Sequence, residues 1–161
     1  MYRICIAIVD ASRARLFQYE RALEPEGPHE QLLELTDLVN PARRLRPSEL
    51  LSSSGQGNHV GVHGYALDDH HEEHAAHLDD EFARAVTGEL KLLTAGVDRL
   101  ILCASPKMLG RLRDVIGALH RPELAISEIP HDLVKLTPSQ LQDQLVSYGV
   151  LPAPFARSSV G

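Results

Sequence analysis

The chain has 161 residues, 43% of them hydrophobic and 24% charged, and a formal net charge of -6 with the histidines neutral. These values predict one globular domain with a substantial core. The negative balance excludes a protein coated in nucleic acid, although a local basic patch can still meet phosphate. No stretch approaches the ~20 apolar residues that span a bilayer, and the N-terminus lacks a signal-peptide pattern.

Cys5 and Cys103 lie in apolar runs. Two buried, reduced thiols fit a cytoplasmic protein with no membrane partner.

Three β-like segments open the chain. The first is apolar and β-branched, which predicts a central strand. In the second, Arg15, Phe17 and Tyr19 alternate and are expected on one face. The links between the segments are short, so we expect an antiparallel meander that ends at Asn40-Pro41. The predicted strands cover residues 3–9, 14–20 and 31–39.

Helices and strands alternate in the second half. An apolar stripe predicts a helix over residues 78–93, and two further helices have start signals at Ser105-Pro106 and Thr137-Pro138. The intervening strands are expected at residues 99–103 and 124–129. A meander followed by α-β-α-β-α predicts an α/β fold with a mixed sheet and helices on its faces. We expect a single domain over residues 1–149 and a loosely held tail over 150–161.

A glycine-rich segment separates the two halves. Residues 52–67 are expected to form a mobile loop, which is longer than a compact domain usually contains. The basic residues Arg43, Arg44 and Arg46 precede it. Guanidinium groups bind phosphate through paired hydrogen bonds, so these arginines are candidate nucleic-acid contacts. A solvated linker is the simpler interpretation, because three charges make a weak electrostatic footprint.

Histidines and acidic residues crowd the segment that follows. His70, His74, His77 and Glu81 would share one stripe of a helix. Residues 70–74 also fit H-x-x-E-H, an inverted zinc-protease pattern. A catalytic zinc needs a third ligand, and the sequence does not name one. We therefore favour a solvated polar helix start over adventitious metal binding, place a metal-dependent hydrolase last, and expect no cofactor and no stoichiometric metal.

A meander followed by αβα also describes nucleases that use two metal ions held by carboxylates at strand ends. Asp10 follows the first predicted strand, and Glu81 could serve from the next helix. The fourth predicted strand ends in Cys103-Ala104-Ser105, without a carboxylate. The missing ligand favours Asp10 as a turn residue rather than a metal ligand.

Several motifs together carry a family resemblance. They are residues 6–17, Leu38-Val39-Asn40-Pro41, the glycine-rich segment, Glu81-Phe82-Ala83, residues 100–110, and Asp132-Leu133 ahead of Thr137-Pro138. With these motifs the chain resembles the bacterial host-attachment protein family, which is similar to the middle domain of archaeal and eukaryotic peptide-chain release factors. The resemblance covers nearly the whole chain up to Gly149 and implies a ribonuclease-H-like α/β fold.

The resemblance also implies a function. In release factors a Gly-Gly-Gln tip enters the ribosome and promotes hydrolysis of peptidyl-tRNA. This chain has Gly55-Gln56-Gly57 after Ser54, so one glycine rather than two precedes the glutamine. The resemblance makes these three residues the candidate catalytic tip of a ribosome- or tRNA-associated factor, and any reaction would be peptidyl-tRNA hydrolysis. The alternative is a non-enzymatic binding protein that is connected indirectly with attachment to host cells.

Overall fold

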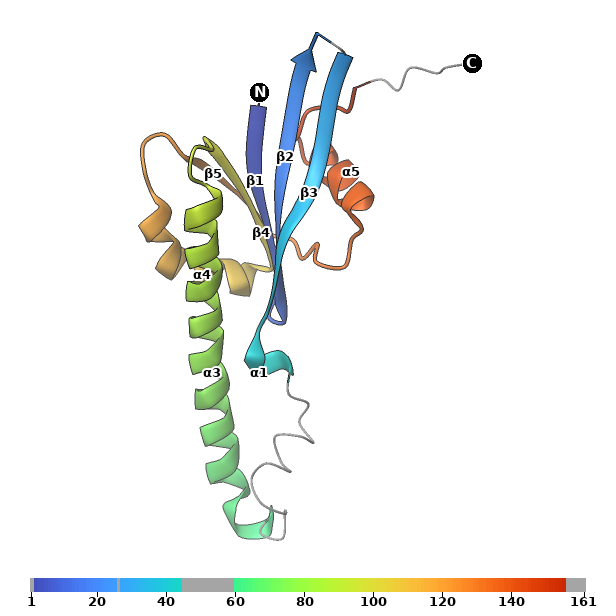
Figure 1. Ribbon diagram of the computed structural model, residues 1–161. Coiled ribbons are helices and arrows are strands. Elements are labelled where there is room, and N and C mark those ends of the chain that lie inside the picture. The colour runs from blue at the N-terminus through green and yellow to red at the C-terminus, as the bar shows by residue number, and fades with distance from the viewer. Residues whose placement is uncertain (1, 26, 45–59, 156–161) are drawn as a thin grey trace.

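The computed structural model describes residues 2–25, 27–44 and 60–155, with side chains except at residues 24, 43, 44, 60–72 and 75. The strands are β1 (Tyr2–Val9), β2 (Arg13–Glu24), β3 (Gly27–Val39), β4 (Arg99–Ala104) and β5 (Ala125–Ile129). The helices are α1 (Pro41–Arg44), α3 (Val60–Leu93), α4 (Pro106–Ile116) and α5 (Pro138–Ser147), with a 3-10 turn η1 (Gly117–Leu119). Figure 1 shows the sheet between α5 on one side and α3 with α4 on the other.

The five strands form one mixed sheet in the order β3-β2-β1-β4-β5. The β3-β2-β1 part is antiparallel, and β1, β4 and β5 run parallel. This arrangement is the ribonuclease-H-like sheet, so the predicted meander and the predicted fold class are both confirmed. The alternation of βα units dictates the parallel half, because a helical crossover returns the chain in the same direction.

The sheet has a hydrophobic core on each face. Leu16 and Leu102 point to the face that α3 and α4 cover. Phe17, Tyr19 and Ile101 point to the face that α5 covers. The predicted shared face of Arg15, Phe17 and Tyr19 is confirmed by the 5.0 Å approach of the Arg15 guanidinium to the Phe17 ring. Because neighbouring residues of a strand alternate in direction, apolar runs in β1 and β4 supply both cores at once.

The predicted helix start signals are confirmed. Ser105 Oγ accepts a hydrogen bond from Met108 N at 3.3 Å. Thr137 and Gln140 form the reciprocal capping box that their spacing predicts. Two glycines in the left-handed region, Gly96 and Gly149, follow α3 and α5 at φ 76°. These local contacts satisfy helix-end groups that would otherwise lack partners.

Within the described residues, no helix is both long enough and apolar enough to cross a membrane.

The β2-β3 hairpin is longer than the sequence indicates. Its ladder continues to the pair Glu24 and Gly27, beyond the strand ends predicted at residues 20 and 31. Pro28 is tolerated because β3 is an edge strand, where a missing N–H breaks no ladder hydrogen bond. Gly27 has φ 126°, a conformation that favours glycine and lets the chain reverse.

The predicted start of the long helix is wrong. Helix α3 begins at Val60 rather than at Leu78, so residues 60–67 are helical and do not belong to a loop. The apolar stripe of residues 78–93 marks only the part of the helix that packs on the sheet. Once that part has formed, each further residue adds a hydrogen bond without a new nucleation cost, so the helix extends beyond its stripe.

The predicted tail is also partly wrong. Leu151 is buried in the α5-side core. Phe155 N donates to Glu30 Oε2 at 3.2 Å, and the Arg21 guanidinium lies 3.8 Å from the Phe155 ring centroid. The chain from residue 150 to 155 is therefore packed against the β2-β3 hairpin. A sequence pattern does not reveal such an anchor, because its partners come from distant strands.

Candidate functional site

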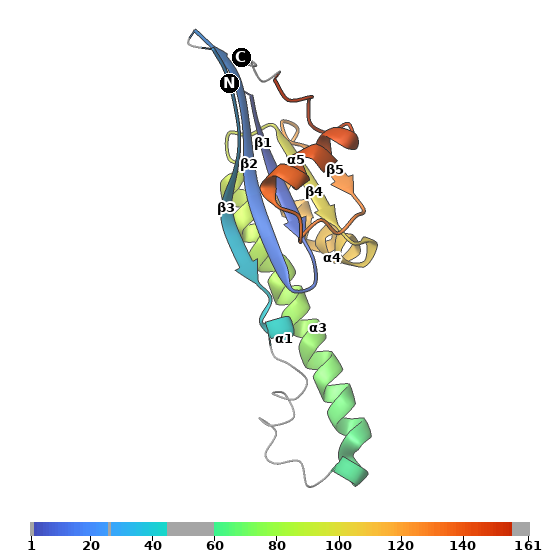
Figure 2. The same ribbon diagram turned by 90° about the vertical axis from the view of Figure 1, so that its right-hand side faces the viewer.

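Helix α3 divides into two parts that differ in their surroundings. Phe82, Val86 and Leu90 are buried against the sheet. His77, one turn before this packed part, has an exposed side chain. In Figures 1 and 2 the N-terminal half of α3 extends away from the sheet and past the strand ends. We call residues 60–77 the arm and the remainder of the domain the body.

The residues predicted to form a tip lie outside the described part of the chain. These are Gly55, Gln56, Gly57 and the basic Arg46. Helix α1, which contains Arg43 and Arg44, lies against α3 where the chain leaves β3. The side chains of these two arginines are not among those described. Their role as phosphate contacts stays a prediction.

The base of the arm is held by a buried hydrogen-bond cluster. Asn40 Nδ2 donates to Asp79 Oδ1 at 2.7 Å and to Ala11 O at 2.8 Å. Asn40 N also donates to Ser12 O at 2.8 Å. Asn40 is 0% exposed and Asp79 is 3% exposed. These contacts join the end of β3, the β1-β2 turn and α3 at one point, and we call them the base clamp. A clamp here fixes the direction in which the arm leaves the body.

Arg111 compensates the buried charge of the clamp. Its Nη2 lies 3.8 Å from Asp79 Oδ2, and its Nη1 donates to Asp80 Oδ1 at 3.2 Å. A buried carboxylate is costly unless hydrogen bonds and an opposite charge surround it, and Asn40 with Arg111 provide both.

A cavity of about 60 Å³ adjoins the clamp, lined partly by Ser105 and Lys107. It lies at the carboxyl ends of β1 and β4, the position at which open α/β sheets bind ligands. Its volume corresponds to roughly two waters at ~30 Å³ each. In its described form the cavity therefore does not accommodate a substrate.

The two carboxylates considered for a nuclease site, Asp10 and Glu81, have different surroundings. Asp10 Oδ1 accepts hydrogen bonds from Ser12 N and Arg13 N, both at 2.7 Å, which confirms its role as a turn residue. Glu81 is exposed, whereas Asp79 faces the strand ends. Asp79 is not among the candidate site residues that the sequence pattern predicted. Its position three residues before Phe82 places a carboxylate on the buried helix face, and that signal could have found it.

The histidine stripe is resolved only in part. His77 Nε2 lies 3.0 Å from Glu81 Oε1, one helical turn away, and both side chains are exposed. His74 is also exposed, and the side chain of His70 is not described. Among the described residues, no three His, Cys, Asp or Glu side chains converge on a point where a metal could bind. The His77 and Glu81 contact is an ordinary surface pair.

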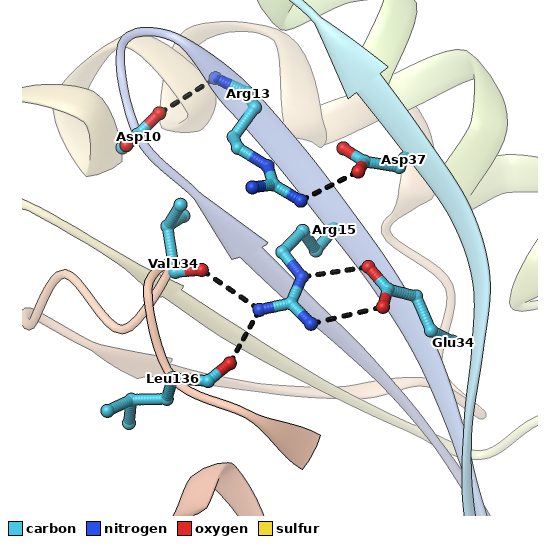
Figure 3. Close-up of polar contacts among 7 residues, drawn as sticks. All are labelled: Asp10, Arg13, Arg15, Glu34, Asp37, Val134 and Leu136. Atoms are coloured by element: carbon cyan, nitrogen blue, oxygen red, sulfur yellow. Dashed lines mark hydrogen bonds and ion pairs between the residues drawn. The ribbon is translucent and has the colours of Figure 1, made fainter.

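Arg15 forms a second polar network, on the α5 side of the sheet (Figure 3). Its Nε and Nη2 donate to the two carboxylate oxygens of Glu34 at 2.8 and 3.0 Å. Its Nη1 donates to Val134 O at 2.9 Å and to Leu136 O at 2.6 Å. The hydrogen bond from Arg15 lowers the pKa of Glu34, and the same bond raises the pKa of Arg15. The network ties the β2-β3 edge to the chain before α5, which is a structural role.

The two cysteines are structural as well. Both are free and buried, as predicted. Burial raises the pKa of the Cys5 thiol and of the Cys103 thiol to about 12. Neither forms an appreciable thiolate at neutral pH, so neither is suited to act as a nucleophile or a metal ligand.

Comparisons with known proteins place the chain in a family. The family model described as "protein required for attachment to host cells" matches residues 5–145. The chain is similar in structure to the Ppx/GppA phosphatase of Aquifex aeolicus in its type II variant, with a TM-score of 0.37, 14% identity, and coverage of 80% of this chain and 36% of that chain. A second Aquifex aeolicus Ppx/GppA structure gives a TM-score of 0.38, 13% identity, and coverage of 80% and 35%. The chain thus spans about a third of the length of these structures. No curated protein matches.

Proposed function

We propose that this chain, which belongs to the family of proteins required for attachment to host cells, is a ribosome- or tRNA-associated factor that acts through Gly55-Gln56-Gly57. The observation that carries the proposal is the projection of α3 from the body (Figure 2). Gln56 precedes Val60, the first residue of the arm, by four positions in the sequence.

A projecting arm suits a target too large for a pocket. The body lacks a substrate-sized cavity at the carboxyl ends of β1 and β4, where the described cavity holds about 60 Å³. An arm that is anchored at Asn40 and Asp79 can reach into a crevice of a large particle while the body stays outside. The ribosome presents such a crevice.

The proposed chemistry, if the tip is catalytic, is hydrolysis of the ester in peptidyl-tRNA. Water adds to the ester carbonyl, the bond to the ribose oxygen breaks, and the tRNA hydroxyl leaves with a proton. Gly55 and Gly57 would allow close approach of the backbone, and Gln56 would help to position the water. This role rests on the release-factor resemblance of the tip.

Charge restricts where nucleic acid can lie. The arm helix contains Asp68, Asp69, Glu72 and Glu73, which repel phosphate. The proposed phosphate contacts are Arg43, Arg44 and Arg46, which precede the glycine-rich segment in the sequence. Three such contacts predict a slope of about -2 to -3 in log affinity against log salt.

The second candidate is a non-enzymatic binding protein with an indirect role in attachment to host cells. The family description favours it. So does Ser54, which stands where release factors have the first glycine of the tip. In this case the arm would bind its target without breaking a bond.

Co-sedimentation with ribosomes at low and high salt tests the association. We expect the full chain in the ribosomal fraction at low salt and its release at high salt. Absence from that fraction at both salt concentrations would refute the proposal. Replacing Arg43, Arg44 and Arg46 by Ala should reduce binding and flatten the salt dependence.

A peptidyl-tRNA hydrolysis assay then separates catalysis from binding. Gln56→Ala is expected to abolish hydrolysis while leaving co-sedimentation unchanged. Gln31→Ala is the matched control, because Gln31 is exposed on β3 and makes no side-chain hydrogen bond within the described residues. Equal hydrolysis by both variants would remove Gln56 from the mechanism. Ribosome binding without any hydrolysis would favour the second candidate.

A further inference from the structure

A groove runs along the outer side of the body where α3 meets α4 and η1. It has a volume of about 370 Å³ and is lined by Arg84, Thr87, Gly88, Lys91, Val115 and Ala118. The two helices pack against each other on the same face of the sheet. The groove belongs to the packed part of α3 and is separate from the arm, so the inference below does not depend on the proposed function.

The surface inside the groove is mostly apolar. Thr87 is buried, and its hydroxyl donates to Ala83 O at 2.9 Å. This bond satisfies the Thr87 hydroxyl inside the helix. Val115 and Ala118 provide the opposite wall. A surface of this kind gains free energy when an apolar side chain covers it.

Gly88 lies inside α3, where glycine lowers the stability of the helix. A glycine inside a helix destabilises it by roughly 1 kcal/mol relative to alanine. A Cβ added at Gly88 would meet nothing within 4 Å, so packing inside the chain does not require glycine there. Its effect is to deepen the groove and to let another backbone approach closely.

Two cations flank Gly88. Arg84 and Lys91 are exposed and form no ion pair or hydrogen bond with any side chain that the structure describes. They lie two helical turns apart, about 10.5 Å along the axis. The charge of Arg84 and Lys91 is opposite in sign to the net charge of the chain, which is -6.

We propose that this groove binds an acidic amphipathic helix of a partner protein. The charge complementarity selects the occupant: carboxylates at i and i+7 match the spacing of Arg84 and Lys91, and apolar residues at i+3 and i+4 lie over Gly88. A nucleic-acid backbone would pair with the cations but would leave the apolar floor uncovered. The helix-in-groove arrangement uses both features at once.

A synthetic peptide tests the proposal on the full chain. The probe is a fluorescein-labelled, alanine-based helix that contains Glu-Ala-Ala-Leu-Leu-Ala-Ala-Glu, and its control has lysine in place of both glutamates. Fluorescence anisotropy should give a Kd on the order of 100 µM for the acidic probe. We expect no binding of the lysine control. Failure of the acidic probe to bind at low salt would overturn the proposal.

Gly88→Leu gives the sharpest variant, because it moves stability and binding in opposite directions. It should raise Tm by about 2–4 °C through helix propensity and abolish peptide binding by filling the groove. Gly110→Leu is the matched control, since Gly110 lies inside α4, has open space at its Cβ position and does not line the groove. It should gain stability and keep binding. Equal binding by both variants would contradict the proposal.

Charge reversal tests the role of the cations. Lys91→Glu should weaken peptide binding on the order of tenfold. Lys135→Glu changes an exposed lysine outside the groove and should leave peptide binding unchanged.

Two other occupants of the groove would give distinct outcomes, and each outcome would overturn the proposal. Tighter binding of a single-stranded RNA oligonucleotide than of the peptide would assign the groove to nucleic acid. Concentration-dependent dimerisation that Gly88→Leu abolishes would assign it to a second copy of the chain.

Discussion

The two halves of α3 belong to one continuous helix but are stabilised differently. The body half presents Phe82, Val86 and Leu90 to the sheet and is held by burial. The arm half extends beyond the sheet and carries Gly61, Gly64 and a run of histidines and acids. It continues a helix that the body half has already formed, so it needs no nucleation of its own. The comparison shows that the apolar stripe of α3 marks the half that packs on the sheet, and that the helix continues beyond this stripe.

The largest expected effect tests the body half. Leu90→Ala should lower the free energy of unfolding by about 2–5 kcal/mol, because it removes a fully buried side chain from the core beneath α3. Leu92→Ala, on the same helix but 71% exposed, should change it by less than about 0.5 kcal/mol. Urea denaturation measures both. Similar losses for the two variants would show that α3 does not pack on the sheet through the face described.

The next effect tests the junction between the halves. Asn40→Ala removes a donor from the buried Asp79 carboxylate and should cost about 3 kcal/mol. Asp80→Ala is the control, since Asp80 is exposed and should contribute less than about 1 kcal/mol. Limited proteolysis should also cut the arm of the Asn40 variant faster. An arm equally resistant in both variants would contradict the role of the base clamp.

A pH experiment tests the network on the opposite face of the sheet, away from α3. The pKa of Glu34 is lowered in the folded state by its hydrogen bond from Arg15. Its stabilising contribution is therefore fully present above the unfolded pKa of about 4.3 and is lost as the pH falls through the folded value. Glu34→Gln should be less stable than the wild type by about 1 kcal/mol at pH 7. This difference should shrink below pH ~4; a difference that is constant down to pH ~2 would exclude the ion pair as its cause.

The smallest expected effect tests the arm half. Gly64→Ala should favour the local helix by roughly 1 kcal/mol and slow amide hydrogen exchange in the arm. The midpoint of global unfolding should stay unchanged, because we expect the arm to open independently of the body. Gly88→Ala is the comparison in the body half, where the same gain should appear in global stability. A global shift for Gly64→Ala would show that the two halves unfold as one unit.

Much of the fold was predictable because its signals are local. The apolar run of β1, the N-cap of α4, the capping box of α5 and the glycines after α3 and α5 depend on neighbours that are close in sequence. The partners of Arg15 could not be predicted, since Val134 lies 119 positions away and meets it only when β2 and the chain before α5 come together. The place of Asp79 on the buried helix face could be read from its spacing to Phe82. Its partner Asn40 could not be predicted, because Asn40 comes from the end of another element.

The order of strands and helices, the caps and the division into an apolar and a polar part of α3 were thus determined by the sequence itself, through periodicity and backbone preferences. Tertiary structure alone decided how far α3 extends, which carboxylate meets the strand ends and how α3 and α4 enclose a groove. These features depend on side chains that are distant in sequence and become neighbours only after the sheet has formed. Residue spacing within one element carries no information about the element that packs against it.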